Sequence, residues 1–270
     1  MSTLVLIILF TLLGGALSVI AAAVFLLAPQ HWRERVLPHL VSFAIGALLG
    51  AAFLALLPHA MLSPGVRDIH DISFTVLFGL LGFFVLEKMI LWRHCHSFAC
   101  EAHTPEHVAD HGHAHGHGER GNRAAGTLIL VGDGLHNFVD GIMIAAAFLT
   151  DTHLGIVTAL AVAAHEIPQE VGDFAVLLDS GFSRARAFYY NLLASLTTVL
   201  GGLLAYFSMA ELRQVTPYVL ALAAASFIYI AVADLIPGLH RRLQPKVTLQ
   251  QLGLILAGVA VIYFAHRTLH

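Results

Sequence analysis

Long apolar stretches separated by short polar breaks run the length of the chain. Each stretch has at least the roughly 20 residues that an α-helix needs to cross a bilayer. The first stretch lacks a preceding basic segment and is too long for a signal-peptide core, so we expect it to be retained as a helix. The pattern predicts an all-α polytopic membrane protein with eight transmembrane helices, over residues 3–28, 36–61, 72–92, 124–150, 154–178, 187–210, 215–239 and 247–266.

The basic residues between these stretches indicate an orientation. Cytoplasmic connections of membrane proteins carry an excess of Lys and Arg. Eleven of the 14 basic residues lie on one set of alternating connections, namely Arg33, Arg35, Lys88, Arg93, Arg120, Arg123, Arg184, Arg186, Arg241, Arg242 and Lys246. The other set holds three, Arg67, Arg213 and Arg267. This alternation predicts that both termini are extracytoplasmic.

One long connection divides the chain into three parts. Residues 1–92 carry helices 1 to 3, residues 93–123 form a cytoplasmic His-rich loop, and residues 124–270 carry helices 4 to 8. The loop holds His94, His96, His103, His107, His111, His113, His115 and His117. Such a low-complexity segment can bind metal but cannot fold. It either senses or buffers metal, or it is an inert solvated linker. Cys95 and Cys100 either lend thiolates to it or are ordinary unpaired cysteines.

Composition and charge narrow the classes of protein that fit. The chain of 270 residues is 58% hydrophobic and 11% charged, whereas soluble domains are about 45–50% apolar and about 25% charged. A net charge of -3 argues against a nucleic-acid partner, and two cysteines cannot form a disulfide scaffold. The predicted surroundings of the chain are therefore a lipid bilayer.

Two of the predicted helices carry polar residues that a lipid-facing helix would not. In the helix over 124–150, one arc of about 100° holds four of them, and in the helix over 154–178, five share one side. They are Asp133, His136, Asn137 and Asp140, and then His165, Glu166, Gln169, Glu170 and Asp173. Helix 6 adds Asn191 and helix 7 adds Asp234.

The carboxylates among these residues need a counter-charge. Six of them lie at membrane depth, Asp133, Asp140, Glu166, Glu170, Asp173 and Asp234, and no Lys or Arg lies deep in a span. Insertion at about 2.5–3.5 kcal/mol each would cost roughly 15–20 kcal/mol in total without partners. A bound cation is the simplest source of positive charge. Asp133, Asp173 and Asp234, each taken alone, fit a structural bond to a neighbouring helix equally well.

The spacing of these residues favours a transition metal. His136 and Asp140 are four residues apart on one helix, as are His165 and Gln169 on the next. Together they offer the imidazole and oxygen ligands that suit zinc, iron or manganese. Pro168 removes one helix hydrogen bond and frees the carbonyl of Ala164 beside them. We therefore expect divalent metal ions as partners, zinc first.

At these two helices the sequence resembles the ZIP (ZRT/IRT-like) metal transporters, particularly their histidine-rich branch. The helix 4 signature His-Asn-x-x-Asp-Gly is matched by His136, Asn137, Asp140 and Gly141. The helix 5 signature His-Glu-x-Pro-His-Glu is matched by His165, Glu166, Pro168 and Glu170, with Gln169 in place of the second His. Shorter matches are Leu86-Glu87-Lys88, Trp92-Arg93-His94-Cys95-His96 and Asp234-Leu235-Ile236-Pro237.

The resemblance implies metal influx into the cytoplasm through a binuclear site between helices 4 and 5, by an elevator-type movement and often as a homodimer. Carried over by position, one metal would be held by His136, Asp140, His165 and Gln169, and its neighbour by Asn137, Asp140, Glu166 and Asn191. Glu170 belongs to the same candidate set. Two departures affect metal and affinity: Gln169, and Ala51 and Ala55 where related sequences often place an acid and a His.

Other functions compete with this interpretation. An intramembrane zinc protease would need His-Glu-x-x-His, but the fifth residue here is Gln169. A cation-efflux carrier would show six spans and a soluble metal domain after them. A non-transporting metal sensor remains an alternative. We expect no catalytic residues and no catalytic cofactor, and zinc as cargo, with iron, manganese or cadmium as alternatives. The lack of Asn-x-Ser/Thr suits a bacterial cytoplasmic (inner) membrane.

Overall fold

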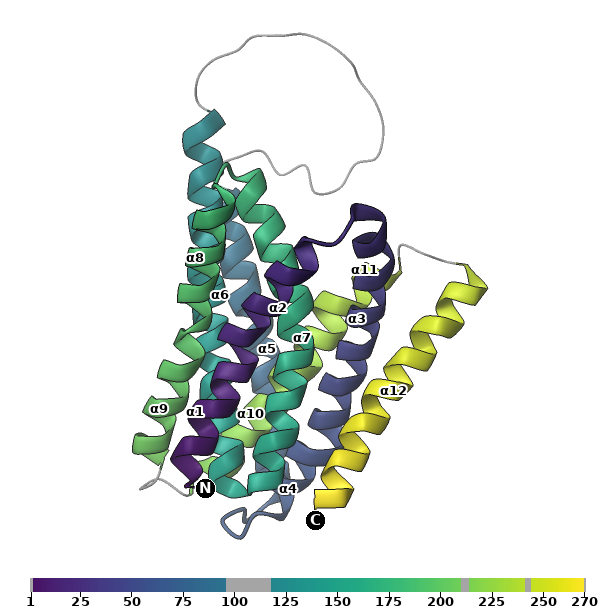
Figure 1. Ribbon diagram of the computed structural model, residues 1–270. Coiled ribbons are helices and arrows are strands. Elements are labelled where there is room, and N and C mark those ends of the chain that lie inside the picture. Colours follow the sequence, from purple (N-terminus) through teal and green to yellow (C-terminus); the bar gives the residue numbers. More distant parts are fainter. Residues whose placement is uncertain (1, 96–117, 210–213, 241–243, 270) are drawn as a thin grey trace.

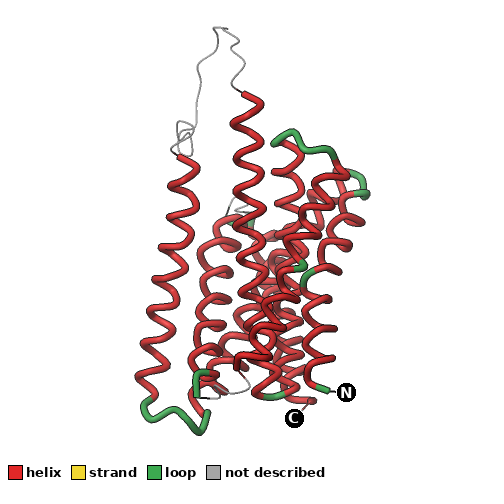
Figure 2. Tube along the Cα trace, turned by 90° about the vertical axis from the view of Figure 1, so that its left-hand side faces the viewer, coloured by secondary structure: helices red, strands yellow, loops and turns green. Residues whose placement is uncertain are grey.

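A computed structural model describes residues 2–95, 118–209, 214–240 and 244–269. Within these ranges every regular element is a helix, and the helices run lengthwise beside one another (Figure 2). The elements are α1 Thr3–Gly14, α2 Ala16–Leu26, α3 Gln30–Gly50, η1 Ala51–Leu56, α4 Leu57–Leu62, α5 Ile69–Cys95, α6 Gly118–Thr150, α7 Thr152–Asp179, α8 Arg184–Ser195, α9 Thr197–Met209, α10 Thr216–Tyr229, η2 Ile230–Leu235, α11 Ile236–Leu239 and α12 Pro245–Leu269.

These elements form the eight predicted spans, because several are consecutive pieces of one long helix. Seven spans in the described residues are long and apolar enough to cross a membrane. The eighth, α7, carries the polar residues of the candidate site, which lower its hydropathy. Helices are expected here because lipid offers no hydrogen-bond partners, so each span must satisfy its own backbone. The all-α polytopic fold is confirmed.

Both described ends of the chain lie at the same end of the bundle (Figure 1). The last turn of α5 and the first turn of α6 lie at the opposite end. His136 and Asp140 lie near the middle of α6, Gly118–Thr150, and His165 lies near the middle of α7, Thr152–Asp179, which packs against α6.

The helices fall into two groups by contact. One group is α1, α2, α6, α7, α8 and α9, within which α6 packs most extensively on α9 and α7. The other is α3, η1, α4, α5, α10, η2, α11 and α12, within which α3 packs most extensively on α12. The two groups meet where α3 and η1 lie against α7, and where α10 lies against α6.

Glycines bring backbones together in the closest helix pair of each group. A Cβ built on Gly141 of α6 would overlap the carbonyl oxygen of Thr198 in α9, and one on Gly201 would overlap that of Phe138. Between α3 and α12, a Cβ on Gly46 would overlap the carbonyl oxygen of Ile255, and one on Gly258 would overlap that of Phe43. Small residues let membrane helices approach in this way, since packing drives their association.

Two spans contain a π-helical segment just ahead of a proline. In η1 the amide of Leu57 donates to the carbonyl of Ala52, five residues back, and in η2 the amide of Ile236 donates to Ala231. Pro58 and Pro237 follow directly, and a proline cannot donate to the carbonyl four residues earlier. The wider turn absorbs that missing bond, and such π segments frequently occur at functional sites.

Two other spans are broken without proline. The first breaks at Gly15, whose φ of -91 and ψ of -95 are not helical. The sixth breaks at Leu196, between α8 and α9. The two breaks touch, because a Cβ on Gly15 would lie 2.5 Å from the carbonyl oxygen of Ser195. The sequence analysis expected one continuous helix in each span.

Candidate metal centre

Four side chains from α6 and α7 converge at the middle of the bundle. His136 and Asp140 lie one turn apart on α6, and His165 and Glu166 are neighbours on α7. One ligand atom from each lies within 4.8 Å of the other three. We call these four residues the His/acid cluster. They are all among the residues expected to bind metal.

The spacing within the His/acid cluster suits a tetrahedral zinc ion. The two Nε2 atoms of His136 and His165 are 3.4 Å apart. His136 Nε2 lies 3.4 Å from Glu166 Oε1 and 3.7 Å from Asp140 Oδ2, and His165 Nε2 lies 3.4 Å from Asp140 Oδ2 and 3.6 Å from Glu166 Oε1. Ligand atoms about 2.0–2.1 Å from one zinc, at tetrahedral angles, would be about 3.4 Å apart.

The imidazole of His165 is oriented by its own helix. Its Nδ1 lies 3.1 Å from the carbonyl oxygen of Ala161. A carbonyl only accepts, so Nδ1 carries the proton and Nε2 presents its lone pair to the cluster. Backbone contacts of this kind commonly fix metal-binding histidines.

Burial makes the cluster a strong candidate for a cation. Asp140 and Glu166 are fully buried, and within the described chain none of their four carboxylate oxygens accepts a hydrogen bond; Asp140 Oδ2 and Glu166 Oε1 face the two histidine Nε2 atoms. Buried charges without partners are costly, so such oxygens normally hold protons or metal. The side chain of His136 is 24% exposed, whereas His165 is 1% exposed. His136 is thus the member of the cluster that can be approached.

A second set of polar residues lies beside the cluster. Asn137 is fully buried; its amide nitrogen donates to Asp133 Oδ1 at 2.9 Å, and its Oδ1 accepts from the Thr198 hydroxyl at 2.8 Å. Glu170 Oε1 accepts from Ser195 Oγ at 2.6 Å, whereas Glu170 Oε2 has no hydrogen-bond partner in the described residues. The amide nitrogen and oxygen of the buried Asn191 side chain also have no hydrogen-bond partner in the described residues. These unmatched atoms could serve a second cation.

The remaining predicted residues are placed less centrally. Gln169 is half-buried on the turn of α7 after His165, and Asp173 is half-buried one turn further. Asp234 lies in η2 and is exposed, so the structure does not bring it into the cluster. The helices extend into the predicted loop of residues 93–123, because α5 ends at Cys95 and α6 begins at Gly118; the rest of the loop, with Cys100, lies outside the described residues.

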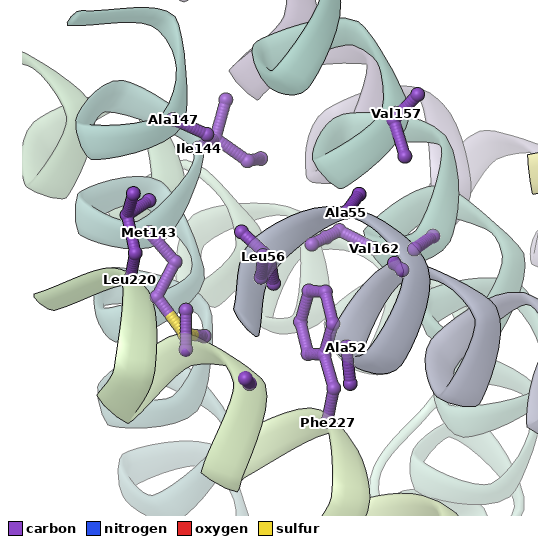
Figure 3. Packing of buried hydrophobic residues seen from close by; sticks show 14 of the residues in the cluster. Ala52, Ala55, Leu56, Met143, Ile144, Ala147, Val157, Val162, Leu220 and Phe227 are labelled. Atoms are coloured by element: carbon purple, nitrogen blue, oxygen red, sulfur yellow. The ribbon is translucent and has the colours of Figure 1, made fainter. Parts of the chain in front are cut away.

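An apolar layer closes the cluster toward the end where the termini lie. Figure 3 shows side chains of η1, α6, α7 and α10 meeting there, among them Leu56, Ile144, Val162 and Phe227. Phe227 is fully buried, and its ring lies 6.2 Å from that of His165. The polar residues Asp133, Glu170 and Asp173 lie toward the opposite end. Any path out of the cluster is therefore more polar on the side away from the termini.

Sequence reasoning missed the hydroxyl donors of the sixth span. Ser195 and Thr198 are fully buried and bond to Glu170 and Asn137. Their signal was the spacing Asn191, Ser195 and Thr198, which places three polar side chains on one helical face. Serine and threonine are common in membrane helices, where they usually bond to their own backbone, so this spacing drew no attention.

Known proteins similar to this chain are metal transporters by name. A family model described as ZIP zinc transporter matches residues 1–266. Zinc transporter ZIP13 of Pongo abelii is 35% identical over 242 residues, with 84% of this chain and 66% of that protein covered. ZIP13 of Homo sapiens is 33% identical (86% and 70% covered), and human ZIP5 is 33% identical (86% and 53% covered). The chain thus spans about two thirds of the ZIP13 relatives and about half of ZIP5.

Proposed function

The chain belongs to the ZIP zinc transporter family, and from this premise we propose that it carries zinc into the cytoplasm through the His/acid cluster. It is a multi-pass integral membrane protein and not an enzyme. Zinc as the metal, the His/acid cluster as its path and the cytoplasm as its destination are what we propose.

One observation carries the proposal. Two imidazoles and two carboxylates, three of them nearly or fully buried, surround a point at tetrahedral zinc spacing. Two nitrogen and two oxygen ligands suit zinc better than magnesium or calcium, which prefer oxygen. Glu166 lies in this set, whereas the family resemblance had placed it at the neighbouring metal.

The unmatched oxygens of Glu166 and Glu170 and the amide of Asn191 support a second metal position beside the first. We propose that Asp140 is shared between the two, because both of its oxygens are free of hydrogen-bond donors in the described chain. Asn137 would then bind through the remaining lone pair of its Oδ1.

An elevator-type movement fits the two groups of helices. The cluster and its neighbours lie in the group of α1, α2, α6, α7, α8 and α9, which could slide as one body. The boundary with the other group is lined by small and apolar residues such as Ala52, Ala55 and Val157. Homodimer formation and a bacterial inner membrane stay predictions; the reported relatives are from animals.

The alternatives fit the structure less well. A protease would need a second imidazole on the turn after His165, where Gln169 stands, and the cluster instead takes its second imidazole from α6. A pure metal sensor would not need carboxylates buried at the middle of a membrane bundle.

Uptake into sealed vesicles tests the proposal. Purified protein in liposomes with a trapped zinc indicator should give saturable zinc entry, absent from protein-free vesicles. Peptide cleavage without zinc entry would favour the protease, and zinc binding without entry would favour the sensor.

Replacing Gln169 with His is expected to shift the metal preference. An imidazole binds borderline metals more firmly than an amide, and more so for zinc than for manganese. The variant should show a lower KM and a lower maximal rate for zinc, because tighter binding slows release, with little change for manganese. Zinc and manganese uptake measured side by side will check this. An unchanged preference would remove Gln169 from the metal site.

The His-rich loop is proposed to sense or buffer metal rather than to carry it. Apart from His94, which lies in α5, its histidines are outside the described residues, whereas the cluster is complete within α6 and α7. A solvated linker without metal affinity remains the alternative.

A further inference from the structure

The break in the sixth span brings two hydroxyl groups to the edge of the metal centre. α8 ends at Ser195 and α9 begins at Thr197, with Leu196 between them. Ser195 Oγ donates to Glu170 Oε1 at 2.6 Å, and Thr198 Oγ1 donates to Asn137 Oδ1 at 2.8 Å. The two hydroxyls at the break therefore hold Glu170 of α7 and Asn137 of α6 in place.

These hydroxyls are not ordinary helix-bonded hydroxyls. Several buried Ser and Thr residues of this bundle donate to a carbonyl of their own helix, as Ser42 does to Pro38 and Thr158 to Leu154. Ser195 and Thr198 instead donate across to other helices. A third hydroxyl at the break, that of Thr197, reaches the carbonyl of Gly134 in α6 at 2.6 Å.

The contact between the two breaks holds this arrangement in place. At Gly15, a Cβ would lie 2.5 Å from the Ser195 carbonyl oxygen and 2.9 Å from Thr198 Oγ1. The absent side chain lets the first span lie directly against both hydroxyl-bearing residues. Ser195 and Thr198 are both fully buried there.

The bond to Ser195 has a specific consequence for Glu170. One carboxylate oxygen is engaged by a neutral donor, and the other has no hydrogen-bond partner within the described residues. A hydroxyl fixes the position of the carboxylate and leaves its charge in place, whereas a Lys or Arg side chain would neutralise that charge. Asn191, one turn before Ser195 on the same face of α8, also presents unmatched polar atoms.

We propose that Ser195 and Thr198 are positioning residues that set the geometry of the second metal position by holding Glu170 and Asn137. Neither hydroxyl needs to touch the metal. This inference rests on the proposed transport function, and it adds two residues outside the family signatures. Groups that orient metal ligands typically contribute 10- to 100-fold in metal affinity or activity.

Two variants with matched controls test the proposal. Ser195→Ala and Thr198→Val each remove one hydroxyl, and Ser42→Ala and Thr158→Val remove buried hydroxyls that bond only within their own helices. We expect the KM for zinc uptake in proteoliposomes to rise about 10-fold in the first pair, with the maximal rate changed less. Both controls should keep the wild-type KM.

Thermal unfolding of the same four proteins without metal separates positioning from folding. Each test variant should unfold close to its matched control. A large drop in unfolding temperature together with an unchanged KM would mean that the hydroxyls are structural only, and an unchanged KM in well-folded protein would also overturn the proposal. Absence of zinc uptake by the wild type would instead contradict the transport function itself.

A double-mutant comparison gives a second, independent measure. If Ser195 acts through Glu170, Ser195→Ala should have little further effect once Glu170→Gln is present. The readout is the zinc concentration that gives a half-maximal rise in unfolding temperature. Additive effects of the two substitutions would show that Ser195 does not act through Glu170.

Discussion

Replacing Asp140 with alanine is expected to abolish zinc uptake while the protein still inserts and folds. Its Oδ2 lies 3.4 Å from His165 Nε2 and 3.7 Å from His136 Nε2, and both of its oxygens lack a hydrogen-bond donor in the described chain. Loss of this carboxylate removes one ligand from the cluster and, in the proposed binuclear site, one from its neighbour. Uptake should fall by more than about 100-fold, beyond the usual effect of a residue that only orients a ligand.

The fold should tolerate this change. Both oxygens of Asp140 are buried without a hydrogen-bond partner in the described chain, so the substitution removes polar atoms whose burial no hydrogen bond offsets. His136→Ala should be less severe, because His136 is partly exposed and belongs to only one of the two proposed metal positions. Asp179→Ala, an exposed acid at the end of α7, is the matched control and should transport normally. Normal uptake by the Asp140→Ala protein would rule out the cluster as the pathway.

Gly141→Val is expected to prevent correct folding, although Gly141 touches no metal. Any Cβ at this position would overlap the carbonyl oxygen of Thr198 and lie 2.8 Å from the amide nitrogen of Gly202. Both obstacles are backbone atoms, so no side-chain rotation can relieve them. Overpacking of a core typically costs about 1–3 kcal/mol, and here α6 and α9 must separate, so we expect at least the upper end.

Folded yield in size-exclusion chromatography and the unfolding temperature will measure this effect. Gly134→Ala in the same helix is the control, because its nearest neighbour would lie 3.9 Å away, an ordinary contact. That variant should fold, since Ala is favoured over Gly in a helix by about 1 kcal/mol. Wild-type stability of the Gly141→Val protein would show that α6 and α9 do not pack as described.

The spans were predictable because each must bury its backbone in lipid with its own hydrogen bonds. The predicted helix over 154–178 corresponds to α7, Thr152–Asp179. The breaks were not predictable in the same way. Gly15 and Leu196 lie in apolar runs without proline, and the two breaks lie against each other across helices that are far apart in the sequence. For the π-helical segments before Pro58 and Pro237, the prolines themselves are the only local sequence signal of the irregularity.

The candidate site shows what helical periodicity can and cannot resolve. Spacing placed His136 and Asp140 on one face and His165 near them, and the structure brings these three together. The sequence analysis grouped Gln169 with them, whereas the fourth side chain of the cluster is Glu166; both residues were expected on the same side of α7. That choice depends on the rotation of α7 about its axis, which packing against α3, α6 and η1 determines.

X-ray absorption at the zinc edge, on wild-type protein and His165→Ala loaded with less than one equivalent of zinc, tests the cluster most directly. We expect about four nitrogen and oxygen ligands at about 2.0–2.1 Å in the wild type, two of them imidazoles, and one imidazole fewer in the variant. Histidines elsewhere are the same in both proteins, so the difference isolates His165. An equal imidazole count in the two proteins, or a sulfur ligand, would contradict the account.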